Sequence, residues 1–144
     1  MLYLRKSRRG FTLIELMVVV AIIGVLSLLG LRLFATQQDK AKNALVKANV
    51  GTIHTLIQGE LADEDGPDVY IMWTDGTLIT ASGIRNPITG ELQVGKGTSL
   101  TVAQGEVWVN YDDTGDKIFY INGRGVKSVV GDNVFGANDL TARK

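Results

Sequence analysis

The chain has 144 residues, with fifteen basic and fifteen acidic side chains, so its formal net charge is zero. This length allows one small domain and an appended segment. There is no cysteine, which excludes a disulfide framework, a cysteine-ligated zinc site and a thiol nucleophile. Beyond the first ten residues, eleven positive charges face fifteen negative ones. That balance argues against a protein that coats nucleic acid with its whole surface.

The chain opens with a short basic leader, residues 1–10, followed by an apolar run at residues 11–31, FTLIELMVVVAIIGVLSLLGL. A helix rises about 1.5 Å per residue and needs roughly 20 residues to cross the hydrocarbon core of a membrane. The run therefore predicts one membrane-spanning helix. Basic residues flank it on both sides, but the leader packs its four closely and has no acidic residue, which favours a cytoplasmic N-terminus. These four are Arg5, Lys6, Arg8 and Arg9.

Residues 32–62 are polar and charged but keep a helical pattern. Apolar residues recur at intervals of three or four and fall on one face of a helix: Val46, Val50, Ile53, Ile57 and Leu61. No proline interrupts residues 11–66. The pattern predicts a continuous helix over 11–61. Its second half is expected to pack on the following domain, and its apolar first half to protrude.

Residues 63–144 are rich in glycine and in short β-like runs, so we expect a C-terminal antiparallel sheet. Val69–Thr74 and Thr77–Ala81 flank Asp75-Gly76, a hairpin signal. Three further strands are expected at Leu100–Val102, Glu106–Tyr111 and Lys117–Asn122, with the turn DDTGD before the last. The pattern gives no placement for residues 126–144. The predicted fold class is α+β, a long N-terminal helix on a small antiparallel sheet.

The junction between leader and apolar run is the strongest functional signal. A secretory signal is cut after its apolar core, at small residues, but the glycine at this junction, Gly10, comes before the core and directly precedes Phe11. Cleavage after Gly10 would remove the leader and keep the helix in the product.

Glu15 places a carboxylate inside the apolar run. A charged residue in a spanning helix costs roughly 2.5–3.5 kcal/mol on insertion scales, so a partner is expected. Cleavage after Gly10 would create one, the α-amino group of Phe11, in the same helix or in a neighbouring copy. Pairing between copies would fix their axial register, which makes Glu15 an assembly residue. The alternative is an interfacial glutamate that reaches out to the membrane edge.

The string GFTLIELMVVVAIIGVL resembles the N-terminal signature of the type IV pilin family, which includes type II secretion pseudopilins and competence pilins. The resemblance implies that Gly10 precedes the cut, that Phe11 becomes the N-methylated first residue, and that Glu15 is the assembly glutamate. A prepilin peptidase would do both modifications, so the chain would be a substrate and not an enzyme. Two features depart from many members: Arg32 stands where they carry proline, and no cysteine closes a C-terminal loop.

The resemblance implies a homopolymer with itself and related pilins, an inner-membrane assembly platform and an ATPase-driven machinery as partners. Membrane lipid surrounds the helix before assembly, in the bacterial cytoplasmic membrane, and the product is a surface filament or a periplasmic pseudopilus. A pseudopilin and a competence pilin remain alternatives; DNA binding has only a few scattered basic residues to support it. The rival from another class is a membrane-anchored sensor or binding domain that stays monomeric.

No cofactor, metal or catalytic residue is predicted. His54, the only histidine, lacks the partners of a triad or metal site and is interpreted as a surface or interface residue. Asp112, Asp113 and Asp116 raise the alternative of a calcium loop, but the spacing fails the EF-hand pattern because Lys117 stands where glycine should be. These aspartates are interpreted as a hairpin turn.

Overall fold

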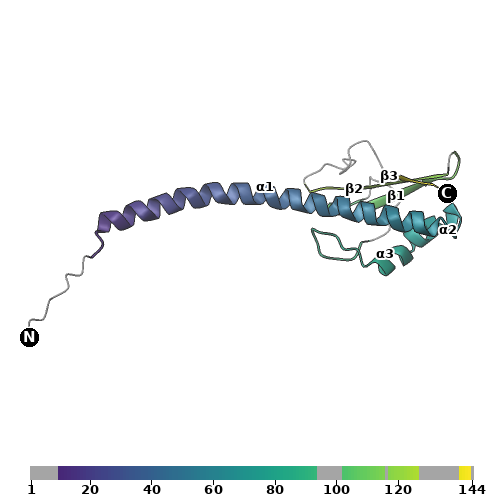
Figure 1. Cartoon of the computed structure of the whole chain (residues 1–144), viewed down its shortest axis with the longest axis horizontal. Helices are drawn as coiled ribbons and strands as arrows, with labels where there is room; N and C mark the ends of the chain where they lie inside the picture. The colour runs from purple at the N-terminus through teal and green to yellow at the C-terminus, as the bar shows by residue number, and fades with distance from the viewer. Residues whose placement is uncertain (1–9, 94–101, 116, 127–139, 144) are drawn as a thin grey trace, which may run out of the picture. The chain divides into compact units, whose positions relative to one another are not determined.

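A computed structural model describes residues 10–93, 102–115, 117–126 and 140–143 (Figure 1). The chain divides into two compact units, Met1–Gln37 and Gln38–Lys144. Helix α1, Leu13–Glu60, contributes to both. The second unit also holds helices α2 (Gly66–Thr74) and α3 (Thr77–Ser82) and strands β1 (Val107–Asp112), β2 (Ile118–Gly123) and β3 (Leu140–Ala142). A long helix with a three-stranded antiparallel sheet confirms the α+β prediction.

In the first unit, α1 carries apolar side chains that no other described part of the chain covers. The large ones are 48–87% exposed, from Phe11 to Phe34. By length and composition this is a helix able to cross a membrane. A soluble domain would bury such a surface against its own core, so it needs lipid or other protein around it.

In the second unit, α1 packs through the predicted apolar stripe. Val46, Val50, Ile53 and Ile57 are fully buried, which confirms that prediction. The helix lies close to β2 at Gly123, where a Cβ atom would lie 2.6 Å from the Val46 side chain. Because glycine has no Cβ, the helix can sit directly on the end of this strand.

The sheet has the strand order β1-β2-β3, and both pairs are antiparallel. Strands β1 and β2 confirm the runs predicted at Glu106–Tyr111 and Lys117–Asn122, each shifted by one residue. The expected turn joins them, with the Asp112 carboxylate accepting hydrogen bonds from the Thr114 amide (3.0 Å) and hydroxyl (2.9 Å). Strand β3 lies in the tail for which the sequence pattern gave no placement.

The expected hairpin at Val69–Thr74 and Thr77–Ala81 is wrong: both segments are helical. Pro67 stands in the first turn of α2, where its missing N–H costs nothing. Val69 and Trp73, four residues apart, are fully buried on one helix face. Gly76, with φ of +88°, is the N-cap of α3 and turns the chain from one helix into the next. The Asp-Gly pair is therefore an interhelical turn.

The strand expected at Leu100–Val102 falls mostly outside the described residues. Its last residue, Val102, is buried but belongs to no strand. Asp116 of the turn and residues 127–139 of the tail also lie outside them.

Two buried side-chain amides connect the loop after α3 to the start of β1 through hydrogen bonds. The Asn86 side chain donates to the Gln104 carbonyl (3.0 Å), and the Gln93 side chain donates to the Gly105 carbonyl (2.8 Å). Gln93 also accepts from the Val107 amide (3.2 Å). Both side chains are only 4% exposed. These bonds cross-link two loops in a chain that has no disulfide.

We expect Gly105→Ala to destabilise the second unit by about 2–4 kcal/mol. Gly105 has φ of +87°, and a Cβ atom there would collide with the buried Asn86 amide. Gly90→Ala is the matched control, because Gly90 has φ of +78° but open space around it. It should cost only the backbone strain, about 1–2 kcal/mol. Denaturant unfolding in detergent, followed by the fluorescence of the buried tryptophans, measures the free energy of unfolding of both variants. Equal losses of stability would show that the collision with Asn86 adds nothing to the backbone strain.

A second prediction concerns acid. The hydrogen bonds from the Thr114 hydroxyl and amide hold the pKa of Asp112 below its ordinary value of 3.8. A carboxyl whose folded pKa is depressed stabilises the fold above its unfolded pKa, and this is lost as the pH falls through the folded value. Asp112→Asn should therefore be less stable than the parent at neutral pH, with the difference closing below about pH 4. Asp63→Asn, at an exposed helix end, controls for charge; a difference independent of pH would contradict the expectation.

Candidate processing and assembly site

The candidate site lies where α1 begins. Gly10, Phe11 and Thr12 are not helical, and the helix starts at Leu13. Phe11 is 87% exposed, and nothing lies within 4 Å of where a Cβ of Gly10 would be. The peptide bond between Gly10 and Phe11 is therefore outside the helix and uncrowded. A protease needs a substrate backbone that is not helical, because the carbonyl and amide groups of a helix are already hydrogen-bonded to one another.

A reciprocal pair of side chains fixes the helix start. The Glu15 carboxylate accepts hydrogen bonds from the Thr12 amide and hydroxyl, both at 2.9 Å. The Thr12 hydroxyl in turn accepts from the Glu15 amide at 3.3 Å. The Thr12 carbonyl takes the bond from the Leu16 amide (3.3 Å), which makes Thr12 the N-cap. This is a capping box, two donors at the helix end satisfied within four residues.

The capping box changes the expectation for Glu15. The sequence argument gave this carboxylate no partner before cleavage, whereas the structure gives it two hydrogen bonds from Thr12. Bonded this way, the acid is less costly to hold in an apolar environment than a bare carboxylate. Thr12 is the residue that the sequence reasoning missed. The signal was present, because threonine followed three residues later by glutamate is the signature of a capping box.

The other candidate residues have structural roles in the second unit. His54 is half-buried, and its Nε2 donates to the Thr141 carbonyl at 2.9 Å. One turn further along α1, the Gln58 side chain donates to the Arg143 carbonyl at 3.0 Å. Together these side chains hold β3 against the helix, so His54 is an interface residue within the chain. Among the described residues, no group of three or more histidine or acidic side chains could hold a metal.

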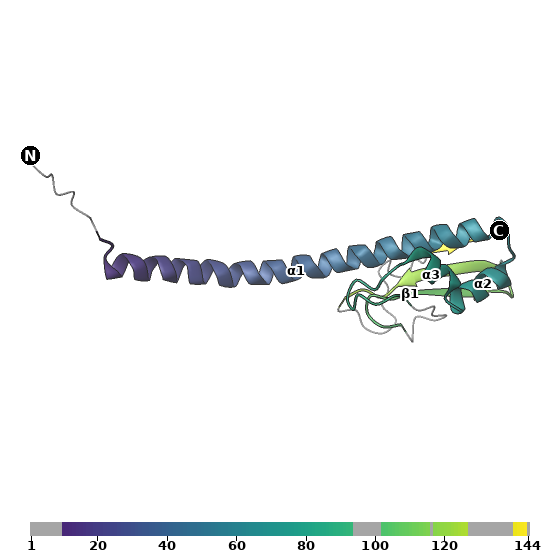
Figure 2. The same ribbon diagram turned by 90° about the horizontal axis from the view of Figure 1, so that it is seen from below.

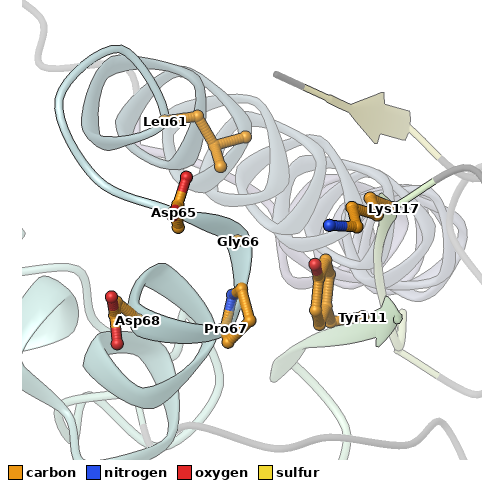
Figure 3. A pocket seen from close by; sticks show the side chains of 7 residues that line it. All are labelled: Leu61, Asp65, Gly66, Pro67, Asp68, Tyr111 and Lys117. Atoms are coloured by element: carbon orange, nitrogen blue, oxygen red, sulfur yellow. The ribbon is translucent and has the colours of Figure 1, made fainter. Parts of the chain in front are cut away.

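A cavity of about 310 Å³ opens at the far end of the second unit (Figure 3). It lies between the α1–α2 connection and the β1–β2 turn. Its lining includes Leu61, Asp65, Pro67, Asp68, Tyr111 and Lys117. Gly66 permits this arrangement, because a Cβ there would lie 2.5 Å from the Tyr111 hydroxyl oxygen. Burial and the neighbouring aspartates, Asp113 first, raise the pKa of Tyr111. The phenol therefore stays neutral beside these acids.

Comparison with known proteins bears on the helix start. Residues 5–31 match the family model described as a prokaryotic N-terminal methylation motif. A type IV major fimbrial protein, FimA of Dichelobacter nodosus, is 36% identical over 81 residues, which are 56% of this chain and 52% of the relative. The type IV major pilin protein PilA of Myxococcus xanthus is 40% identical over 57 residues, 40% of this chain and 26% of the relative.

The N-terminal part of the chain is therefore similar to type IV pilins. A fimbrial protein of Eikenella corrodens, EcpB, is also 40% identical over 63 residues, 44% of this chain and 40% of that protein. The chain spans about half the length of the first curated relatives it matches. No solved structure matches it. The methylation motif covers Gly10, Phe11, Thr12 and Glu15, so the capping box lies inside the segment that matches this family model.

Proposed function

We propose that this chain is the precursor of a structural subunit of a type IV pilus-like filament. The observation that carries the proposal is the sequence motif at residues 5–31, together with a helix that begins directly after Gly10-Phe11-Thr12 and whose large apolar side chains are exposed as far as Phe34. Relatives named as major fimbrial proteins favour a pilin over a pseudopilin. As a subunit, the chain is a substrate of processing and has no reaction of its own.

Processing comes first. A prepilin peptidase hydrolyses the bond between Gly10 and Phe11 and releases residues 1–10, and the new amine of Phe11 is then N-methylated. Support comes from the position of this bond, which lies outside the helix and in open space. Until assembly, residues 11–31 span the cytoplasmic membrane with the N-terminus inside, next to the basic leader. Residues 32–62 continue the helix into the domain formed by residues 63–144.

Assembly then exchanges lipid for neighbouring helices. Because lipid is as apolar as the helix surface, this exchange gains little from burial, and helix packing and polar pairing must supply the specificity. Glu15 supplies the polar pairing. In the filament, the Glu15 carboxylate pairs with the Phe11 amine of a neighbouring copy and either gives up its hydrogen bonds from Thr12 or keeps them beside the new pair. This pairing sets the axial register of the two helices. An assembly platform in the inner membrane and its ATPase drive the step.

Immunogold electron microscopy with antibodies to the second unit tests this function. Labelled filaments on the cell surface, absent from a strain without the gene, are the expected result. Label confined to the envelope, with cleaved protein in short assemblies, would favour a pseudopilin of a type II secretion system. Protein that stays monomeric in the membrane under all conditions would overturn the proposal in favour of an anchored sensor. DNA uptake is a separate question, answered by transformation of the same two strains.

A further inference from the structure

Two groups of like charge lie at opposite ends of the α1 segment that belongs to the second unit. The first end is where the α1–α2 connection meets the β1–β2 turn, held together by the contact of Gly66 with Tyr111. We call this end the acidic pole and define it by seven carboxylates in the described residues: Glu60, Asp63, Glu64, Asp65, Asp68, Asp112 and Asp113. Lys117 is the cation that lies among them at the cavity.

The opposite end carries lysines on α1. We call it the basic pole and define it by Lys40, Lys42 and Lys47; the acidic residue Asp39 directly precedes them in α1. Asn43, beside them, accepts a hydrogen bond from the Val126 amide at 2.6 Å, so this part of α1 is fixed to the chain after β2. Lys40 is exposed and Lys42 is half-buried. The basic pole is therefore held in place relative to the sheet.

The two poles cannot neutralise each other within one copy. Lys42 and Glu60 are eighteen residues apart in α1, which is about 27 Å along the helix. Charges in solution are screened beyond about 8 Å at physiological ionic strength. The attraction between the poles can therefore act only between different copies of the chain.

The acidic pole also has a cavity suited to a lysine side chain (Figure 3). Leu61, Pro67 and the Tyr111 ring give it apolar walls, while Asp65 and Asp68 add two carboxylates. An aliphatic stem with a charged head matches such a mixture, because the stem packs on apolar surface while the ammonium group meets acid. The tyrosine ring adds a cation–π partner.

We infer that the acidic pole of one copy binds Lys40 and Lys42 of a second copy in a head-to-tail contact. The inference rests on the proposed filament, since the apolar helices bring the copies together. Figure 2 shows the second unit with α1 along its side, α2 at one end of that segment and the sheet beside it. A contact between two different surfaces leaves one of each surface open on every pair, so it can repeat from copy to copy along a filament.

Charge reversal tests the pairing in cells that assemble the full chain. Lys40→Glu/Lys42→Glu makes the basic pole acidic, and Asp65→Lys/Asp68→Lys makes the acidic pole basic. Each double variant alone places like charges together, so sheared filament should fall about tenfold or more while cleaved subunit still accumulates in the membrane. Lys40→Arg/Lys42→Arg keeps the charge and should assemble normally. Carrying all four reversals in one chain recreates opposite charges and should restore filaments.

The outcomes separate this inference from the function on which it rests. If the parent chain never forms filaments, the proposed function fails. If the parent forms filaments and both reversed variants do so equally well, or if the fourfold variant stays as poor as the double ones, the pairing is wrong. If the Asp65→Lys/Asp68→Lys variant does not accumulate in the membrane, the Asp65→Asn/Asp68→Asn variant is used in its place. Relative to the parent, the Asp65→Asn/Asp68→Asn variant should lose more filament at low salt than at high salt, because screening at high salt already weakens the pairing in the parent. A loss that does not depend on salt would overturn the pairing.

Discussion

Gly10→Val is expected to leave the chain uncut, with residues 1–10 still attached and no filaments on the cell. The reason lies in recognition and not in folding, because nothing stands within 4 Å of a Cβ at this position. A β-branched residue is stiff and restricts the backbone, whereas glycine lets the extended chain lie close against a peptidase. Immunoblots for the size of the membrane-bound protein measure the effect.

Gly10→Ala is the graded control for this prediction. Alanine adds one carbon without branching, so cleavage should slow but continue. Gly24→Ala, inside α1 and equally uncrowded, should be cut at the parent rate. If Gly10→Val were cleaved as fast as the parent, the site of processing would lie elsewhere in the leader.

Glu15→Leu is expected to have opposite effects on the membrane-bound subunit and on the filament. Removing the carboxylate relieves an insertion cost of roughly 2.5–3.5 kcal/mol, so the subunit should stay in the membrane at least as well as the parent. Filament yield should nevertheless fall about tenfold or more, because the neighbour's Phe11 amine loses its partner and a buried unpaired charge is strongly penalised. Quantifying cleaved subunit in the membrane and in sheared filaments gives both numbers.

Two further variants separate the charge of Glu15 from its role in the capping box. Glu15→Gln can still accept from the Thr12 amide and hydroxyl but has no charge, whereas Thr12→Val removes the hydroxyl and leaves the charge. If pairing with an amine drives assembly, Glu15→Gln should fail and Thr12→Val should retain most filaments. The reverse result would show that the helix cap, and not the charge, carries the effect.

The helix could be read from the sequence because its signals are long and agree with one another. The apolar run, the stripe from Val46 to Leu61 and the absence of proline all pointed to one element, and α1 ends within one residue of the expected end. Strands β1 and β2 were also found, since alternating β-branched and aromatic residues flank a clear turn.

The segment at 66–82 shows why short apolar runs mislead. VYIMWT has the composition of a strand, and Asp-Gly is a strong hairpin signal. What decided the structure was Pro67 just inside a helix start and the four-residue spacing of Val69 and Trp73, which puts both into the core on a helical face. Strand β3 has only three residues and is held by His54 and Gln58 from far earlier in the chain. Such long-range contacts leave no local pattern.

In the candidate site, too, some residues could be proposed from the sequence and others only from the structure. Gly10, Phe11 and Glu15 could be proposed from residue type and position together with the resemblance of the N-terminal string to pilins, and their roles stay proposals. Thr12 and its bonds to Glu15 needed the structure, because a cap is defined by where the helix begins. The poles of the second unit also depended on the fold, since Asp65 and Asp112, far apart in the sequence, both act on Tyr111, which contacts Gly66.

The intact mass of the protein in sheared cell-surface filaments tests the central claim most directly. The account predicts one species that begins at Phe11 and carries one additional methyl group on its amino terminus. A filament protein that still begins at Met1 or Leu2 would contradict cleavage after Gly10, and with it the pairing of Glu15 with a new amine.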